Sequence, residues 1–136
     1  MSWCFVISTG QLSLDGQPAA TGYAGRGTGK NNPECCSAPM GSLGAGNFGP
    51  LPAGKYTIGP AYDDPHRGQY TMHLNPDAET RMHGRSGFLI HADSVAEPGE
   101  ASEGCIVPVA GVHGESGLEI RARIAASPDR DLEVQG

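Results

Sequence analysis

The chain has 136 residues, which is enough for a single domain with a sizeable buried core. Its 21 glycines, 11 prolines and few aromatic residues favour a turn-rich β protein over a helical bundle. The formal net charge of −6, with nine Lys and Arg residues that form no basic block, argues against nucleic-acid binding, and no apolar run approaches the roughly 18 residues of a membrane span.

The first 24 residues predict a β-meander. Residues 3–8 are rich in β-forming side chains, and Leu12 and Leu14 alternate with polar residues in the next stretch. Asp15-Gly16 then gives a strong hairpin signal, with residues 21–24 as the return strand.

A glycine-rich segment, residues 25–50, follows the meander. It contains seven glycines and little periodicity, and connections of this length inside a domain are usually functional or disordered. Its densest polar cluster is Lys30, Asn31 and Asn32. We interpret the segment as a solvated surface loop.

Three further strands are predicted before residue 92. Residues 55–59 and residues 69–74 alternate apolar and polar side chains, as half-buried strands do. Residues 88–91 form a short apolar run that ends in His91, so this imidazole is expected at the end of a strand.

Beyond residue 108 the hydrophobic pattern takes the period of a helix. Ser116-x-x-Glu119 is a capping box, and Ile120 and Ile124 are spaced four residues apart. Glu119 and Arg123 can pair on the surface of this helix.

Pro128 is expected to end the helix, and residues 131–135 predict a last strand. The sequence therefore predicts a mainly β fold with six to eight short strands and one C-terminal helix, formed by a single domain over residues 1–136.

A loop leaves from His91 and returns to Cys105, which can bring the imidazole and the thiol together. An imidazole beside a thiol generates the thiolate that nucleophilic catalysis needs. Gly104 permits a sharp turn before Cys105 and leaves amide N–H groups to face a developing oxyanion. The alternative is a buried structural cysteine with an unrelated histidine.

Metal chemistry is a less favoured alternative. A site built from Cys105, His91 and His83 is conceivable, but the sequence has no CxxC or close His/Cys pair of the kind that zinc requires. We therefore predict neither a metal ion nor another cofactor. Of the remaining cysteines, Cys4 could pair with Cys35 or Cys36.

These residues resemble the signature of the L,D-transpeptidase family, in which a His is followed by Ser/Thr-x-Gly-Cys and an aliphatic residue. Here the match is His91 and Ser102-Glu103-Gly104-Cys105-Ile106. The segments GYAGRGTGKNNPE, GPLPAGKYTIG and GRSGFLIHADS are similar to a small branch of the family that includes effectors injected through the type VI secretion system.

The resemblance implies an L,D-transpeptidase-like β-sandwich or barrel that acts on the tetrapeptide stems of peptidoglycan, as an L,D-carboxypeptidase, an L,D-transpeptidase or a D-amino-acid exchange enzyme. It assigns Cys105 as nucleophile, His91 as base and the Ala92 carbonyl as the group that orients the imidazole. The Gly104 and Cys105 amides would stabilise the oxyanion, and Ser102 would hold the loop by hydrogen bonding.

Two residues are candidates for substrate binding, Arg85 and Tyr70, because a stem peptide carries free carboxylates that a guanidinium matches. Glu103 and Val107 depart from the residues common in the family, and an acidic Glu103 opposes thiolate formation. These departures leave open a catalytically inactive peptidoglycan-binding module of the same fold.

The apolar run at residues 3–7 has no preceding basic residue and no cleavage site, so we expect no secretory signal peptide. Together with the resemblance, this implies a protein made in the cytoplasm and delivered to the periplasm of a target bacterium. Its expected partners are stem peptides, the secretion machinery and a cognate immunity protein.

Overall fold

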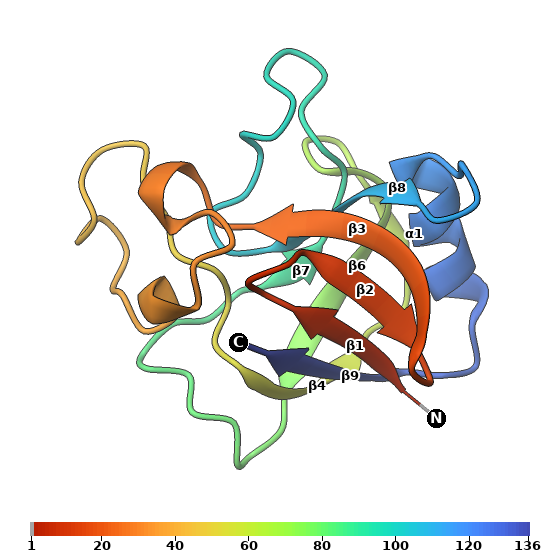
Figure 1. Ribbon diagram of the computed structural model, residues 1–136, viewed down its shortest axis with the longest axis horizontal. Helices are drawn as coiled ribbons and strands as arrows, with labels where there is room; N and C mark the ends of the chain where they lie inside the picture. Colours follow the sequence, from red (N-terminus) through yellow and green to blue (C-terminus); the bar gives the residue numbers. More distant parts are fainter. Residues whose placement is uncertain (1) are drawn as a thin grey trace.

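The computed structural model describes residues 2–136 and consists of a closed β-barrel with one α-helix (Figure 1). The strands are β1 (Trp3–Val6), β2 (Gln11–Leu14), β3 (Gln17–Ala24), β4 (Gly54–Ile58), β5 (Tyr62–Asp64), β6 (Gly68–Pro76), β7 (Leu89–Ile90), β8 (Ile106–Gly111) and β9 (Asp131–Gln135). The helix is α1 (Gly117–Ala126), and two 3₁₀ turns are η1 (Gly27–Gly29) and η2 (Pro33–Cys35).

Eight strands form the barrel in the order β4-β9-β1-β2-β3-β8-β7-β6, and β6 closes the ring by pairing with β4. The short β5 pairs with β6 outside the ring. The predicted mainly β fold with a C-terminal helix is therefore confirmed, and of the two expected architectures the barrel is the one formed. Sequence analysis missed β5, because three residues are too few to show a period.

The N-terminal meander forms as predicted. Asp15 and Gly16 both have positive φ, 51° and 81°, which is the backbone of a two-residue type I′ hairpin between β2 and β3. On its other edge β1 pairs in parallel with β9, so the first and last strands of the chain lie side by side in the barrel wall (Figure 1).

The barrel interior is filled by every second residue of its strands, the ones whose side chains face inward. Trp3 and Phe5 of β1, Tyr56 of β4 and Leu132 of β9 are at most 2% exposed. Burying a large apolar side chain contributes about 1.5–3 kcal/mol, so these four positions alone make the ring a strong scaffold for its loops.

The helix α1 begins at the predicted capping box. The Ser116 side chain accepts a hydrogen bond from the Glu119 amide while the Glu119 carboxylate accepts one from the Ser116 amide. Because that carboxylate is committed to the cap, the predicted pair with Arg123 does not form, and Arg123 lies 3.9 Å from Glu115 instead. The buried Arg121 ties the helix to the barrel by donating to the Gln69 carbonyl of β6.

The segment 25–50 is more ordered than a solvated loop. It contains η1 and η2, and an antiparallel bridge between Arg26 and Phe48 closes its neck. Its returning end docks on the chain near Cys105, because the Leu51 amide donates to the Gly104 carbonyl at 2.9 Å. Among residues 2–136, no helix has the length and apolar character needed to cross a membrane.

Candidate active site

Strands β7 and β8 bring His91 and Cys105 to the same part of the barrel. They pair in parallel with Ile90 opposite Ile106, so His91 directly follows one strand and Cys105 directly precedes the other. Ile90 and Ile106 pack in the core. Since successive side chains of a strand alternate between its faces, the imidazole and the thiol both point away from that core.

A cleft of about 1040 Å³ lies over these two side chains. His91 and Cys105 form part of its floor and are only 4% and 9% exposed. Charged and imidazole side chains from four separate segments line its walls: Arg26, His66, Arg67, His83, Arg85, Asp93, Glu100 and Glu103. The cleft therefore combines a buried thiol and imidazole with a polar, charged rim.

The Cys105 thiol is a buried group with one direct hydrogen-bond donor. The Leu89 amide lies 3.3 Å from its Sγ. Burial raises the pKa of the thiol; the Leu89 amide and the positive charge of Arg67 act in the opposite direction, and Glu103 raises the pKa further. Because the net effect raises the pKa above the usual value of a cysteine thiol, the resting thiol is protonated at neutral pH.

The His91 imidazole is oriented by the backbone of the next residue. Its Nδ1 lies 2.7 Å from the Ala92 carbonyl oxygen, and because a carbonyl only accepts, the proton resides on Nδ1. Burial lowers the pKa of His91 below 6.5, although the Ala92 hydrogen bond opposes this. The imidazole is therefore neutral at pH 7, with Nε2 free to accept a proton.

Ser102 fastens the turn that presents Cys105. Its Oγ donates to the Cys105 carbonyl at 2.6 Å and accepts from the Gly104 amide at 3.0 Å and the Gly25 amide at 2.9 Å. The side chain is fully buried. These bonds tie the residues around the thiol to the neck of the segment 25–50, as expected for a residue that holds the loop.

The family model of the Tlde1 domain matches residues 18–112, which include both His91 and Cys105. The chain belongs to the Tlde1 domain family. This is a family of type VI secretion effector domains of the L,D-transpeptidase kind, so membership places the chain among effectors with peptidoglycan-related activity. The comparisons with curated proteins and with solved structures gave no match.

Gly104 of this Tlde1 domain forms the expected turn, but its amide N–H is already hydrogen-bonded. Its φ of +131° suits glycine, and a Cβ built there would lie 2.5 Å from a Phe88 ring carbon, so the sharp turn before Cys105 is as expected. Its amide, however, already donates to Ser102 Oγ. The predicted pair of oxyanion donors is thus reduced to the Cys105 amide, because Ser102 needs the Gly104 amide to hold the turn.

Arg85 lines the cleft, but its guanidinium is engaged elsewhere. It donates to the carbonyl oxygens of Cys36, Pro50 and Gly49 at 2.7, 2.5 and 3.0 Å, and it lies 5.0 Å above the Phe88 ring. These contacts use three of the five N–H donors of the guanidinium and fix its position. Arg85 therefore clamps the end of the segment 25–50 against the site, and its role in substrate binding stays a prediction.

Tyr70 lies outside the cleft. Met72 and Leu74 of the same strand are buried, but Tyr70 has a positive φ of 56° and is 37% exposed. The left-handed backbone breaks the strand alternation that placed the three side chains on one face, and Tyr70 is not part of the cleft lining. The structure thus does not place Tyr70 at the cleft, and its role in substrate binding stays a prediction.

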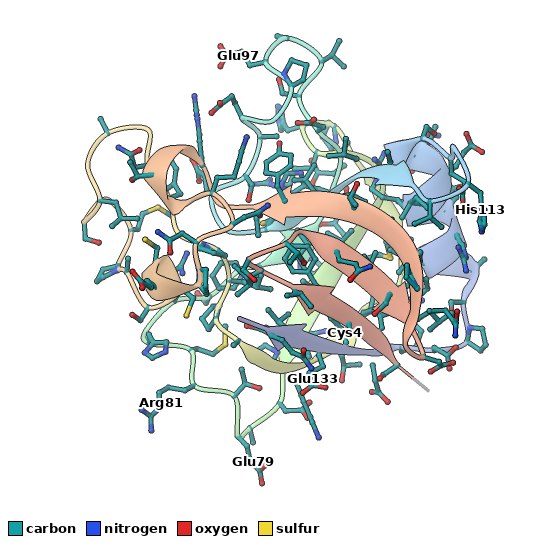
Figure 2. The ribbon with its side chains drawn as sticks, viewed as in Figure 1. Cys4, Glu79, Arg81, Glu97, His113 and Glu133 are labelled. Atoms are coloured by element: carbon teal, nitrogen blue, oxygen red, sulfur yellow. The ribbon has the colours of Figure 1, made fainter. Side chains whose placement is uncertain are left out.

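A residue pair absent from the sequence-based prediction shapes the loop between His91 and Cys105. The Tyr23 hydroxyl donates to Asp93 Oδ1 at 2.5 Å and accepts from the Ala101 amide at 3.0 Å, while Asp93 also accepts from the Gly99 amide. The strand pattern of residues 21–24 does not reveal which groups the Tyr23 hydroxyl contacts. Glu97 marks the projecting tip of this loop (Figure 2).

Arg67 is a further cleft residue absent from the sequence-based prediction. It lies in the turn between β5 and β6, lines the cleft, and its charge lowers the pKa values of both Cys105 and His91. The pattern Asp64-Pro65 marks a turn, but nothing local indicates that this turn packs beside the catalytic candidates.

The cysteines and histidines form no further site among the described residues. Cys4, Cys35, Cys36 and Cys105 are all free thiols in the structure, so neither suggested disulfide is formed. No three His, Cys, Asp or Glu side chains within residues 2–136 lie close enough together to share a metal ion.

Proposed function

We propose that the chain is a cysteine-dependent enzyme that modifies the tetrapeptide stems of peptidoglycan. The observation that carries this proposal is the buried thiol of Cys105 just before β8 and the imidazole of His91 just after the paired strand β7, in one cleft, with Nδ1 bound to the Ala92 carbonyl. A base with a fixed tautomer beside a thiol is the arrangement required for covalent acyl transfer. Membership of the Tlde1 family supports the choice of substrate.

The first half of the reaction forms a thioester. His91 Nε2 accepts the Cys105 proton as Sγ attacks the carbonyl between the third stem residue and the terminal D-alanine. The protonated imidazole then gives that proton to the departing amine, and D-alanine leaves. General-base assistance of this kind contributes about 10²–10⁴-fold to the rate.

The second half resolves the thioester. His91 accepts a proton from the incoming nucleophile, and the thiol of Cys105 is regenerated. Water gives L,D-carboxypeptidase activity, whereas an amine gives D-amino-acid exchange or an L,D-transpeptide cross-link. The raised pKa of Cys105 and the lowered pKa of His91 imply that the resting pair is neutral and that the proton moves when substrate enters the cleft.

We also propose, from family membership, that the chain is an antibacterial effector that acts in the periplasm of a target bacterium. Effectors of the type VI secretion system imply a cognate immunity protein and a secretion machinery as partners. An immunity protein that inhibits this activity would have to cover the cleft or block the loop that carries Glu97.

Purified muropeptides and mass spectrometry test the enzymatic proposal. The wild-type chain should remove or exchange the terminal D-alanine of tetrapeptide stems, and Cys105→Ala should abolish both reactions. Cys4→Ala is the matched control, because Cys4 is a partly exposed thiol on β1 that does not line the cleft. Full activity of Cys105→Ala would refute the proposed nucleophile.

The alternative is a catalytically inactive peptidoglycan-binding module. The observation in its favour is that Glu103, an acidic residue of the cleft, adds to the effect of burial in raising the pKa of Cys105. Such a module would bind stem peptides and leave the terminal D-alanine in place, so the same experiment separates the two functions.

A further inference from the structure

Three arginines line the cleft, and they differ in what their side chains contact. Arg26 pairs with Glu100 at 3.1 Å and with Glu97 at 3.6 Å. Arg85 donates to three backbone carbonyls. Within residues 2–136 the guanidinium of Arg67 has no hydrogen-bond acceptor and no ion-pair partner, so of these three it is the one whose donors are all available to an anion.

The backbone of Arg67 is nevertheless fixed. Asp64 Oδ1 accepts from the amides of His66 and Arg67 at 2.8 and 2.9 Å, which closes the turn between β5 and β6. The Arg67 carbonyl then accepts from the Ala92 amide at 2.9 Å. At Gly68 an added Cβ would lie 2.8 Å from the Ala92 side chain, so this turn packs directly on the residue that orients His91.

The charge of Arg67 acts on the reacting groups themselves. It favours the thiolate form of Cys105 and the neutral form of His91, as a cation near both groups does. Glu103, the acidic residue two positions before Cys105, lines the same cleft and also has no ion-pair partner among the described residues. An anionic group of a substrate is therefore repelled by Glu103 and attracted by Arg67.

A free guanidinium matches a carboxylate, because its planar set of donors can form two parallel hydrogen bonds with the two oxygens. In the proposed reaction, the terminal D-alanine carries a carboxylate on the carbon next to the scissile nitrogen. That carboxylate enters the cleft whenever the scissile carbonyl meets Cys105. A second carboxylate, on the side chain of the diamino acid, lies on the other side of the scissile bond.

We propose that Arg67 binds the free α-carboxylate of the terminal D-amino acid and thereby selects stems that end one residue after the scissile bond. This inference rests on the proposed function. It predicts an enzyme that acts on chain ends and not within longer peptides, and it predicts that an incoming free D-amino acid uses the same contact in the exchange reaction.

Binding to the Cys105→Ala chain tests the carboxylate contact without turnover. The probes are a synthetic tetrapeptide stem with a free terminal carboxylate, the same stem as a terminal amide, and a stem amidated only on the diamino-acid side chain. Because a hydrogen bond to a charged group is substantial, the free acid should bind about 10- to 100-fold more tightly than the terminal amide. Side-chain amidation should change the dissociation constant little.

Arg67→Gln in the same background should lower affinity for the free acid to that for the terminal amide and leave amide binding unchanged. Arg81→Gln is the matched control, since Arg81 is an exposed arginine that points away from the barrel and does not line the cleft (Figure 2). Equal binding of acid and amide, equal weakening of both by Arg67→Gln, or no binding of either would overturn the inference. Sensitivity to side-chain amidation alone would assign Arg67 to the other carboxylate and overturn it too.

Turnover by the chain with Cys105 intact separates this inference from the proposed function. Arg67→Gln should raise KM for the free acid more than it lowers kcat, whereas a merely structural loss would lower kcat for acid and amide alike. If D-alanine is released but acid and amide react equally, the proposed function stands and the Arg67 site fails. If the binding preference is present but no D-alanine is released, the site stands and the enzymatic proposal fails.

Discussion

Ser102→Ala is expected to destabilise the fold strongly, because one hydroxyl satisfies three buried backbone groups. Its Oγ donates to the Cys105 carbonyl and accepts from the amides of Gly104 and Gly25. Each buried polar group left without a partner costs about 1–3 kcal/mol. Since the turn can relax and a water molecule can enter the space, we expect a total loss of roughly 3 kcal/mol in the free energy of unfolding.

Urea or thermal unfolding followed by circular dichroism measures this loss. For a chain of this size, 3 kcal/mol corresponds to a fall in Tm of roughly 10 °C. Ser42→Ala is the matched control: the Ser42 hydroxyl is exposed and donates only to the Pro39 carbonyl, so its loss should change the free energy of unfolding by less than about 0.5 kcal/mol. If Ser102→Ala were as stable as Ser42→Ala, the reasoning about this turn would be wrong.

Three further predictions concern the groups around the thiol. Gly104→Ala should lose both stability and D-alanine release, because Gly104 has a φ of +131° and a Cβ there would lie 2.5 Å from Phe88. Gly114→Ala is the control with a positive φ but open space around the Cβ, and it should lose less stability. Equal unfolding midpoints of the two variants would contradict the predicted clash with Phe88. Glu103→Gln should lower the pKa of Cys105 and speed its alkylation by iodoacetamide at pH 7–8 several-fold, whereas an unchanged alkylation rate would show that Glu103 does not act on the thiol. Because burial lowers the pKa of His91 from its ordinary 6.5, the unfolded chain binds more protons than the folded chain in the window just below pH 6.5, and the free energy of unfolding should rise with pH through that window and level off above it. His91→Gln should lack this rise when urea unfolding is measured as a function of pH. Identical pH profiles for the wild type and the variant would show that His91 does not contribute to the rise.

Local chemical signals account for the elements that could be predicted from the sequence. The Asp15-Gly16 turn and the Ser116 capping box depend only on neighbouring residues, and both form in the structure. The strand-end position of His91 and the return of the chain at Cys105 are also local, which is why the two central residues of the candidate site could be named from their sequence context.

The rest of the site depends on contacts between distant segments, and the sequence carries no signal for these. Arg85 looked free to bind substrate, but its partners are backbone carbonyls of the segment 25–50, which any residue type can supply. The bond from the Gly104 amide to Ser102 Oγ is local in sequence, but the same Oγ also binds the distant Gly25 amide, which no local pattern indicates. Arg67 reaches the cleft only because its turn docks on Ala92.

The most direct test of the central claim is the trapping of a covalent intermediate on Cys105. The chain is mixed with a tetrapeptide stem, quenched with acid within milliseconds to seconds, and analysed by intact-protein and peptide mass spectrometry. If Cys105 is the nucleophile, the peptide that contains it should carry an adduct with the mass of the stem acyl group without its D-alanine. The Cys105→Ala variant should carry no such adduct. Release of D-alanine by a chain that never carries this adduct, or by Cys105→Ala, would contradict the account.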